Sequence, residues 1–255
     1  MGVSGSPENA AREARRDLSL GADGPVSDLL QRIEIGGRVN VVLAKLPEGG
    51  PAGAYTRERD VPFILVNSRE PVVRQRFTLA HEYGHHRLGH GSVCDDRIWW
   101  GATDPREAAA NRFAAEFLVP VAGVDLWFHA ERAHSVSVET LVRLANVYGV
   151  SCETALWRAK AAARITASAA DRLKKRLEAN EHHGLRSQLG LSEIVDTITV
   201  SQSLQVRVPA RMLGDVLKAL ELGIITDAQA AEKLRVTKAQ LRGELERRSR
   251  DLSDE

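Results

Sequence analysis

Residues 81–85 have the sequence His-Glu-Tyr-Gly-His, which places two histidines four positions apart. On an α-helix this spacing puts His81 and His85 on one face, about one turn apart, so that both imidazoles can reach one metal ion. Glu82 projects beside them, where its carboxylate can take a proton from metal-bound water. A catalytic zinc site has three protein ligands and one open position. The motif therefore predicts a helix that carries two zinc ligands and a general base.

The residues around the motif favour a partly buried helix from about 71 to 88. Apolar Phe77, Leu79 and Ala80 precede the motif. A buried pair of histidines needs polar partners, and a metal ion is the simplest one. The alternative is a surface helix with clustered histidines, which these apolar neighbours argue against. Gly84 costs a helix up to about 1 kcal/mol relative to alanine, and either close approach of another backbone or loose packing would explain it.

His86 and His90 form a second pair with the same spacing, but Arg87 stands where a general base would be needed. We therefore interpret both as polar residues at the helix end, with His90 near the mouth of the site. The residue that stabilises an oxyanion has three unranked candidates, Tyr55, His90 and Tyr148.

The third ligand is expected on a following helix. Asp104 suits the N-cap, Pro105 suits the first turn and Glu107 stands at the capping-box position. Small and apolar residues continue this helix to Pro120, and the alanines allow close packing against the motif helix. Glu107 and Glu116 are the acidic candidates, although a glutamate at position 107 is also suited to capping its own helix.

Two blocks of sequence, Arg76–His85 and Glu107–Pro120, resemble those of the ImmA/IrrE family of metallopeptidases. Short apolar segments at 53–55 and 63–67 match two strands that precede the catalytic helix in that family. The resemblance covers about residues 25–165. It implies that each chain binds one Zn²⁺ through His81, His85 and Glu107. It also implies that Glu82 is the general base.

The resemblance implies a zinc endopeptidase that acts in the cytoplasm on a regulatory protein, a helix-turn-helix transcriptional repressor, in stress response. Many relatives carry a glutamate where this chain has Ala109, two residues before Asn111, which leaves Glu107 as the better third ligand. An extended substrate is expected at the sheet edge near residues 62–67. The alternative is a non-catalytic transcription regulator or toxin–antitoxin component, but an open three-ligand site beside Glu82 favours catalysis.

Composition agrees with a soluble enzyme. The chain has 255 residues, of which 43% are hydrophobic and 27% charged, enough for one sizeable core and a smaller unit. Its net charge of +1 indicates no global attraction to nucleic acid or membrane. We find no run long enough to span a membrane and no signal-peptide core. Cys94 and Cys152 lack metal or redox spacing and are expected to be reduced thiols in the cytoplasm.

The hydropathy pattern predicts an α+β fold, mostly helical, with a small three-stranded sheet packed on a helical zincin-like core. The first strand is expected at 39–43, after a short helix near Leu29–Ile33, and the others follow at 53–58 and 62–67. Later helices are expected at 121–131, 137–148 and 151–164. The last two resemble a helix-turn-helix, which we interpret as scaffold. Trp99 and Trp100, in a loop at 91–103, are expected to pack on the core.

The predicted organisation has four parts, namely a flexible tail at 1–24 that can include a short helix from Pro7, the peptidase domain at 25–165, a helical linker at 166–190 and a C-terminal unit at 191–255. Residues 155–187 carry eight basic and three acidic side chains, which indicates a solvated helix face.

In the C-terminal unit, alternation at 198–208 predicts a half-buried strand, a helix is expected at 210–222, and two short helices within 226–241 resemble a helix-turn-helix. From 209 to 255 the nine basic and nine acidic residues give no positive face for DNA. DNA contact, dimerisation and docking onto a repressor stay open.

Overall fold

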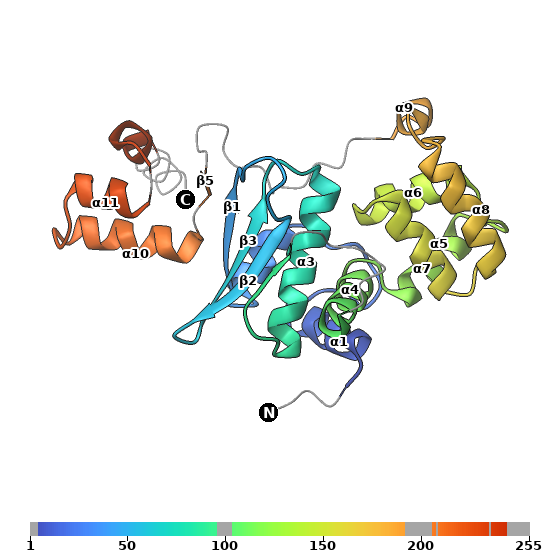
Figure 1. The fold of residues 1–255 in the computed structure, drawn as a ribbon, viewed down its shortest axis with the longest axis horizontal. Helices are drawn as coiled ribbons and strands as arrows, with labels where there is room; N and C mark the ends of the chain where they lie inside the picture. Colours follow the sequence, from blue (N-terminus) through green and yellow to red (C-terminus); the bar gives the residue numbers. More distant parts are fainter. Residues whose placement is uncertain (1–4, 96–103, 192–205, 208, 235, 244–255) are drawn as a thin grey trace.

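The computed structural model describes residues 5–95, 104–191, 206–207, 209–234 and 236–243 of the chain. Trp99, Trp100 and most of the strand predicted at 198–208 lie outside the described residues. Figure 1 shows a small sheet with helices on both of its sides.

The sheet has the strand order β4-β2-β3-β1-β5. Three of these strands are the predicted ones, and two short strands extend the sheet at its edges; the bounds are β1 (Asn40–Ala44), β2 (Gly53–Glu58), β3 (Val61–Asn67), β4 (Val93–Asp95) and β5 (Val206–Arg207). β3 pairs parallel with β1 and antiparallel with β2, so it lies inside the sheet. The predicted α+β class, mostly helical with a small sheet, is confirmed.

Alternate side chains of the sheet point into the main core. Val41 and Leu43 of β1 and Ile64 and Val66 of β3 are fully buried, and the residues between them are partly exposed. This period of two is what a strand with one covered face requires. The helix α3 (Val72–Leu88) packs against β2 and β3 and carries the His-Glu-Tyr-Gly-His motif.

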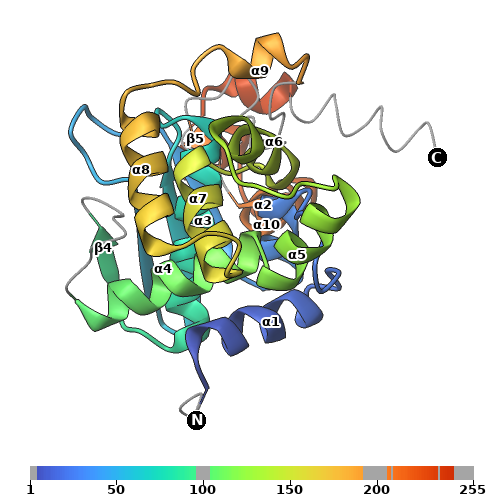
Figure 2. The ribbon, with the colours of Figure 1, turned by 90° about the vertical axis from the view of Figure 1, so that its right-hand side faces the viewer.

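Helix α4 (Pro105–Leu118) packs along α3, and α1 (Pro7–Asp17) packs in turn on α4 (Figures 1 and 2). Gly149, with a positive φ, ends α6 (Val138–Tyr148), and Ser151 caps α7 (Cys152–Ala161), close to the helix bounds predicted at 137–148 and 151–164. The remaining helices of this part are α2 (Leu29–Ile35), α5 (Val121–Ala130), α8 (Ala167–Glu178) and α9 (Leu185–Gln188).

The N-terminal segment differs from the flexible tail predicted over residues 1–24. Ser6 caps α1, whose Ala10, Ala11 and Ala14 are buried in the main core. Alanines contribute little to a hydropathy pattern, but their small side chains let α1 approach α4 closely. The tail prediction is therefore wrong for the described part of this segment.

Residues 166–190 are helical, as predicted, but they do not form a linker. Helix α8 buries Ala170, Leu173 and Leu177 in the main core, where it packs on α7 and α6. The spacing of three and four residues gives α8 one apolar stripe, and this stripe needs a covering partner. The main core thus extends beyond residue 165, the predicted domain boundary.

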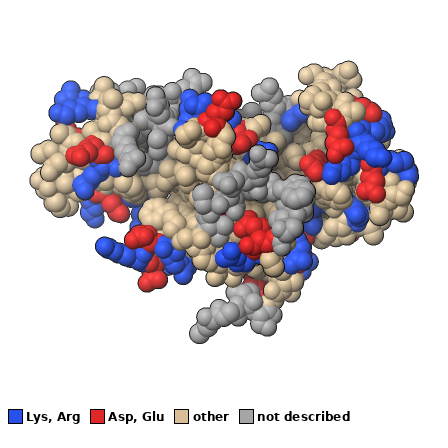
Figure 3. Space-filling view, viewed as in Figure 1, with Lys and Arg blue, Asp and Glu red and all other residues tan. Residues whose placement is uncertain are grey.

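The basic segment at 155–187 exposes much of its charge to solvent. Arg164 pairs with Asp125, and Arg176 pairs with Glu181. Figure 3 shows basic and acidic side chains interspersed at the right-hand end of the molecule, where α7 and α8 lie in Figure 1. The arrangement agrees with the predicted solvated helix face.

The stretch Pro105–Ala130 is long and apolar enough to cross a membrane by length and composition, but 67% of its most apolar 18-residue window is buried inside the fold. It consists of α4 and α5, which meet at Pro120. We therefore assign it to the core of the fold.

The C-terminal part contains α10 (Ala210–Glu221) and α11 (Asp227–Lys233), which share a second, small core with Leu234 and Leu241. Thr226 and Gln229 form a capping box at the start of α11. The described strand β5 pairs antiparallel with β1, so this part of the chain reaches the main sheet. The helix-turn-helix assignment stays a prediction.

Arg15 gives a test of the N-terminal packing. It is 2% exposed, and its guanidinium donates to the carbonyl oxygens of Gly21, Gly24 and Phe117. Arg15→Met removes these donors, and each carbonyl left without a partner costs about 1–3 kcal/mol. We expect the free energy of unfolding, measured in urea, to fall by about 3 kcal/mol or more. The exposed neighbour is the control: Arg16→Met should change it by less than about 0.5 kcal/mol. This account would be contradicted if Arg15→Met and Arg16→Met lowered the free energy of unfolding by equal, small amounts.

Candidate metal centre

Helix α3 brings the motif into the interior of the protein. His81, Glu82 and His85 are all 0% exposed. The helix is buried on two sides, because the sheet covers one face and α4 covers another. Its observed bounds, Val72–Leu88, agree with the predicted helix at 71–88.

Glu107 of α4 lies against both histidines. His81 Nε2 lies 3.0 Å from His85 Nε2 and 3.2 Å from Glu107 Oε2. His85 Nε2 lies 3.4 Å from Glu107 Oε1. Two ligands of a tetrahedral zinc ion, bonded at about 2.0–2.1 Å, stand roughly 3.3 Å apart. The three donor groups therefore have the separations that one small divalent metal ion requires, and two imidazoles with one carboxylate are a suitable donor set.

The start of α4 explains how Glu107 reaches this place. Asp104 is the N-cap and its carboxylate accepts from the Arg106 amide, so the cap is made without Glu107. Pro105 occupies the first helical position, as the sequence predicted. Glu107 lies in the first turn, with its carboxylate directed to the histidines rather than to the helix end.

Glu116, the other acidic candidate, lies at the far end of α4. It is 2% exposed and pairs with Arg158 and Arg12. These contacts give the carboxylate a structural partner away from the histidines. Among the described residues, the acidic group that joins His81 and His85 in a possible metal site is Glu107.

Gly84 is required by the packing of α3 on α4. A Cβ atom at this position would lie 2.9 Å from Phe113 Cδ1 and 3.3 Å from Phe113 Cβ. Of the two explanations that the sequence left open, close approach is the one observed. The approaching group is the Phe113 side chain and its helix, not a backbone near the metal position.

Gly53 of β2 lies over the catalytic candidate Glu82. A Cβ atom at Gly53 would lie 2.8 Å from Glu82 Oε1 and 3.0 Å from the Leu65 carbonyl oxygen, and it would also overlap Thr78. The strand can therefore pass this close to the carboxylate only with glycine at position 53. This contact places β2 beside the motif.

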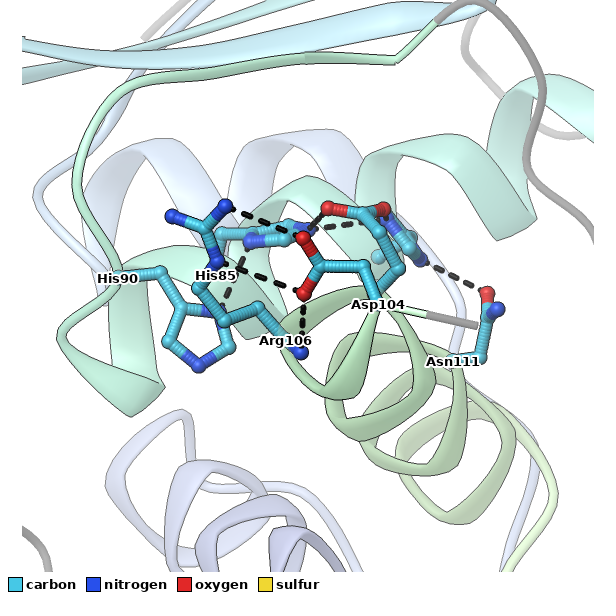
Figure 4. A network of polar contacts seen from close by, with 7 residues as sticks. His85, His90, Asp104, Arg106 and Asn111 are labelled. Carbon is cyan, nitrogen blue, oxygen red and sulfur yellow. Dashed lines mark hydrogen bonds and ion pairs between the residues drawn. The ribbon is translucent and has the colours of Figure 1, made fainter. Parts of the chain in front are cut away.

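The two candidate histidine ligands also each contact a further side chain through Nδ1, the ring nitrogen that does not face Glu107. His81 Nδ1 lies 2.9 Å from Asn111 Oδ1, and His85 Nδ1 lies 2.9 Å from His90 Nδ1. Figure 4 shows Asn111 and His90 on opposite sides of the centre. The spacing of four residues puts Asn111 on the same face of α4 as Glu107. The sequence predicted His90 near the mouth of the site, but neither His90 nor Asn111 had a predicted partner.

The three oxyanion candidates have different surroundings. Tyr148 donates to the Asp23 carbonyl oxygen, at 2.9 Å, in the packing between α6 and the segment before α2. Tyr55 is 2% exposed, and its hydroxyl lies 3.2 Å from His86 Nδ1. Of the three, His90 is the residue that contacts a candidate ligand.

His86 lies in the last turn of α3, as the sequence predicted, and its side chain is half-buried there. It lies between Tyr55 and Tyr83, with its ring stacked on that of Tyr83. Burial, with Arg57 and Arg87 nearby, lowers the pKa of His86 to about 4. The imidazole is therefore neutral at pH 7 and serves as a half-buried polar partner for Tyr55.

A motif helix under a small sheet, with a glutamate supplied by the next helix, defines a zincin-like metallopeptidase domain. Residues 37–160 match the family described as the IrrE N-terminal-like domain. Residues 37–160 therefore form a domain of the ImmA/IrrE family of metallopeptidases, and the resemblance found in the sequence is confirmed over these residues. No curated protein matches the sequence.

The three-donor site can be tested by metal content. We expect elemental analysis to find one metal ion per wild-type chain, and to find it lost in His81→Ala, His85→Ala and Glu107→Ala, because two protein ligands bind a divalent ion weakly. Asp104→Asn is the matched control, since it removes a carboxylate from the same helix turn and keeps an N-cap. Retention of the metal in Glu107→Ala would show that the third ligand lies elsewhere.

Proposed function

We propose that the protein is a zinc-dependent endopeptidase of the cytoplasm that cleaves a helix-turn-helix transcriptional repressor. The observation that carries the proposal is an open set of three donors, His81, His85 and Glu107, directly beside the buried carboxylate of Glu82. A structural zinc site is closed by four protein ligands, whereas a catalytic one has three and leaves a position for water or substrate.

The metal and Glu82 have separate tasks in this proposal. A bound zinc ion supplies a Lewis acid that polarises the scissile carbonyl and makes water a better nucleophile at neutral pH. Glu82 takes the proton from the attacking water and later delivers it to the nitrogen of the leaving amine. β2 and α3 shield the carboxylate of Glu82 from bulk solvent, and Glu82 is 0% exposed.

The substrate is proposed to bind along the edge of the sheet that lies beside Glu82. The edge expected near residues 62–67 is wrong, because β3 pairs with β2 on one side and β1 on the other. β4 is the better edge, since it is the outermost strand on that side of the sheet and its Asp95 pairs with Gly53, which lies against Glu82. Strand addition to β4 would bring an extended peptide to the side of the sheet that holds Gly53 and the general base.

The repressor and the cytoplasm enter the proposal through the family resemblance. The half-buried Cys152 is a free thiol, and partial burial raises its pKa to about 11, so that it is an unreactive residue compatible with a reducing compartment. The C-terminal helices α10 and α11 form their own small core, which gives the chain a second unit for docking a repressor, contacting DNA or pairing with another copy.

Glu82→Gln tests catalysis without changing the size of the side chain. We expect it to retain the metal and to lower kcat by about 10²–10⁴-fold, because a positioned general base contributes an effect of that size. The substrate is found by comparing new protein N-termini, by mass spectrometry, in cells that express the wild type or Glu82→Gln. Cleavage is then measured with the purified proteins.

The control for this experiment is Glu58→Gln, which changes an exposed glutamate on β2 and should retain wild-type activity. The proposal would be contradicted if no N-terminus depended on Glu82 while both proteins caused the same change in transcription. That result would favour the non-catalytic regulator instead.

A further inference from the structure

Each of the two candidate histidine ligands contacts, through Nδ1, a side chain that can accept a hydrogen bond. Asn111 Oδ1 contacts Nδ1 of His81, and His90 Nδ1 contacts Nδ1 of His85, both at 2.9 Å. The ring planes of His85 and His90 lie at 64° with centroids 4.9 Å apart, an edge-on arrangement (Figure 4). The second contact is a nitrogen-to-nitrogen hydrogen bond.

The chemistry of these atoms fixes which nitrogen carries the proton. An amide oxygen only accepts, so Asn111 Oδ1 requires a proton on His81 Nδ1 and leaves the lone pair on Nε2. Two nitrogens in a hydrogen bond share one proton. His85 Nε2 can offer its lone pair to a metal ion held with Glu107 only if the shared proton lies on His85 Nδ1. His90 Nδ1 is then the acceptor of the hydrogen bond.

The backbone holds His90 in this place. Gly89 ends α3 with φ 71°, a conformation that favours glycine, and this turns the chain back over the last helical turn. The amide of His90 then donates to the carbonyl oxygen of His85 at 3.0 Å. His90 is therefore hydrogen-bonded to His85 twice, through its backbone amide and through its ring.

We propose that His90 is a positioning residue of the metal centre, which holds the His85 ring and its tautomer as Asn111 holds those of His81. The inference rests on the proposed function, because it takes the two histidines as zinc ligands. Loss of such an outer partner typically weakens metal binding by about 10–100-fold. It also assigns the Nδ1 atom of His90 to His85, which removes that atom from the candidates for oxyanion stabilisation.

The test is the zinc dissociation constant, measured by competition with a chromophoric chelator in the full chain. His90→Asn and His90→Leu form a matched pair, because the side chains have similar size and only asparagine offers an acceptor oxygen near the place of Nδ1. We expect His90→Leu to weaken zinc binding by about 10–100-fold and His90→Asn to recover most of the loss. Asn111→Leu should weaken binding like His90→Leu.

Two controls separate positioning from folding and from unspecific binding. The thermal unfolding of the metal-free variants should match that of the wild type. His129→Leu removes an exposed histidine and should leave the zinc dissociation constant unchanged. Equal affinity in wild type and His90→Leu, or equal weakening in His90→Leu and His90→Asn, would overturn the inference while leaving the proposed function intact. Failure of the wild type itself to bind zinc would instead overturn the proposed function.

Discussion

The close packing of α3 against α4 is the constraint on which the rest of the structure depends. Gly84 leaves room for Phe113, and this contact sets the distance between the two helices. At that distance the first turn of α4 brings Glu107 to His81 and His85. A larger residue at position 84 would separate the helices and so would separate the ligands, because side chains that donate to one metal have little freedom in their spacing.

Buried arginines hold the ends of these elements, where helices leave carbonyl oxygens without intrahelical donors. Arg15 donates to Phe117 and Arg158 to Val119, both at the end of α4. Arg76 of α3 donates to Gly149, which ends α6, and burial lowers its pKa to about 10, so it stays charged at pH 7. Helix α1, which carries Arg15, lies outside the matched residues 37–160, yet it covers α4. The domain that supports the site is thus larger than the part that the family comparison identifies.

Local patterns were sufficient to predict the motif helix, the three main strands and the start of α4, because the spacing of apolar residues and the capping residues act over a few positions. The order of the strands was not predictable in this way, since β3 lies between β1 and β2 through pairings that depend on the whole chain. The alanine face of α1 gave little hydropathy signal. The burial of His86 and the contact of His90 with His85 depend on where neighbouring segments end in space. The sequence therefore identified the ligands more readily than the residues that hold them.

The X-ray absorption spectrum of the zinc-loaded protein at the zinc edge tests the central claim most directly. The account predicts a four-coordinate ion with two imidazole nitrogens and only oxygen donors besides, all at about 2.0–2.1 Å. It also predicts that His85→Ala, which loses the site, does not give this two-imidazole spectrum under the same zinc loading. A shell of sulfur at about 2.3 Å, a third or fourth imidazole, or a spectrum that does not change in His85→Ala would contradict an open metal site built by α3 and α4.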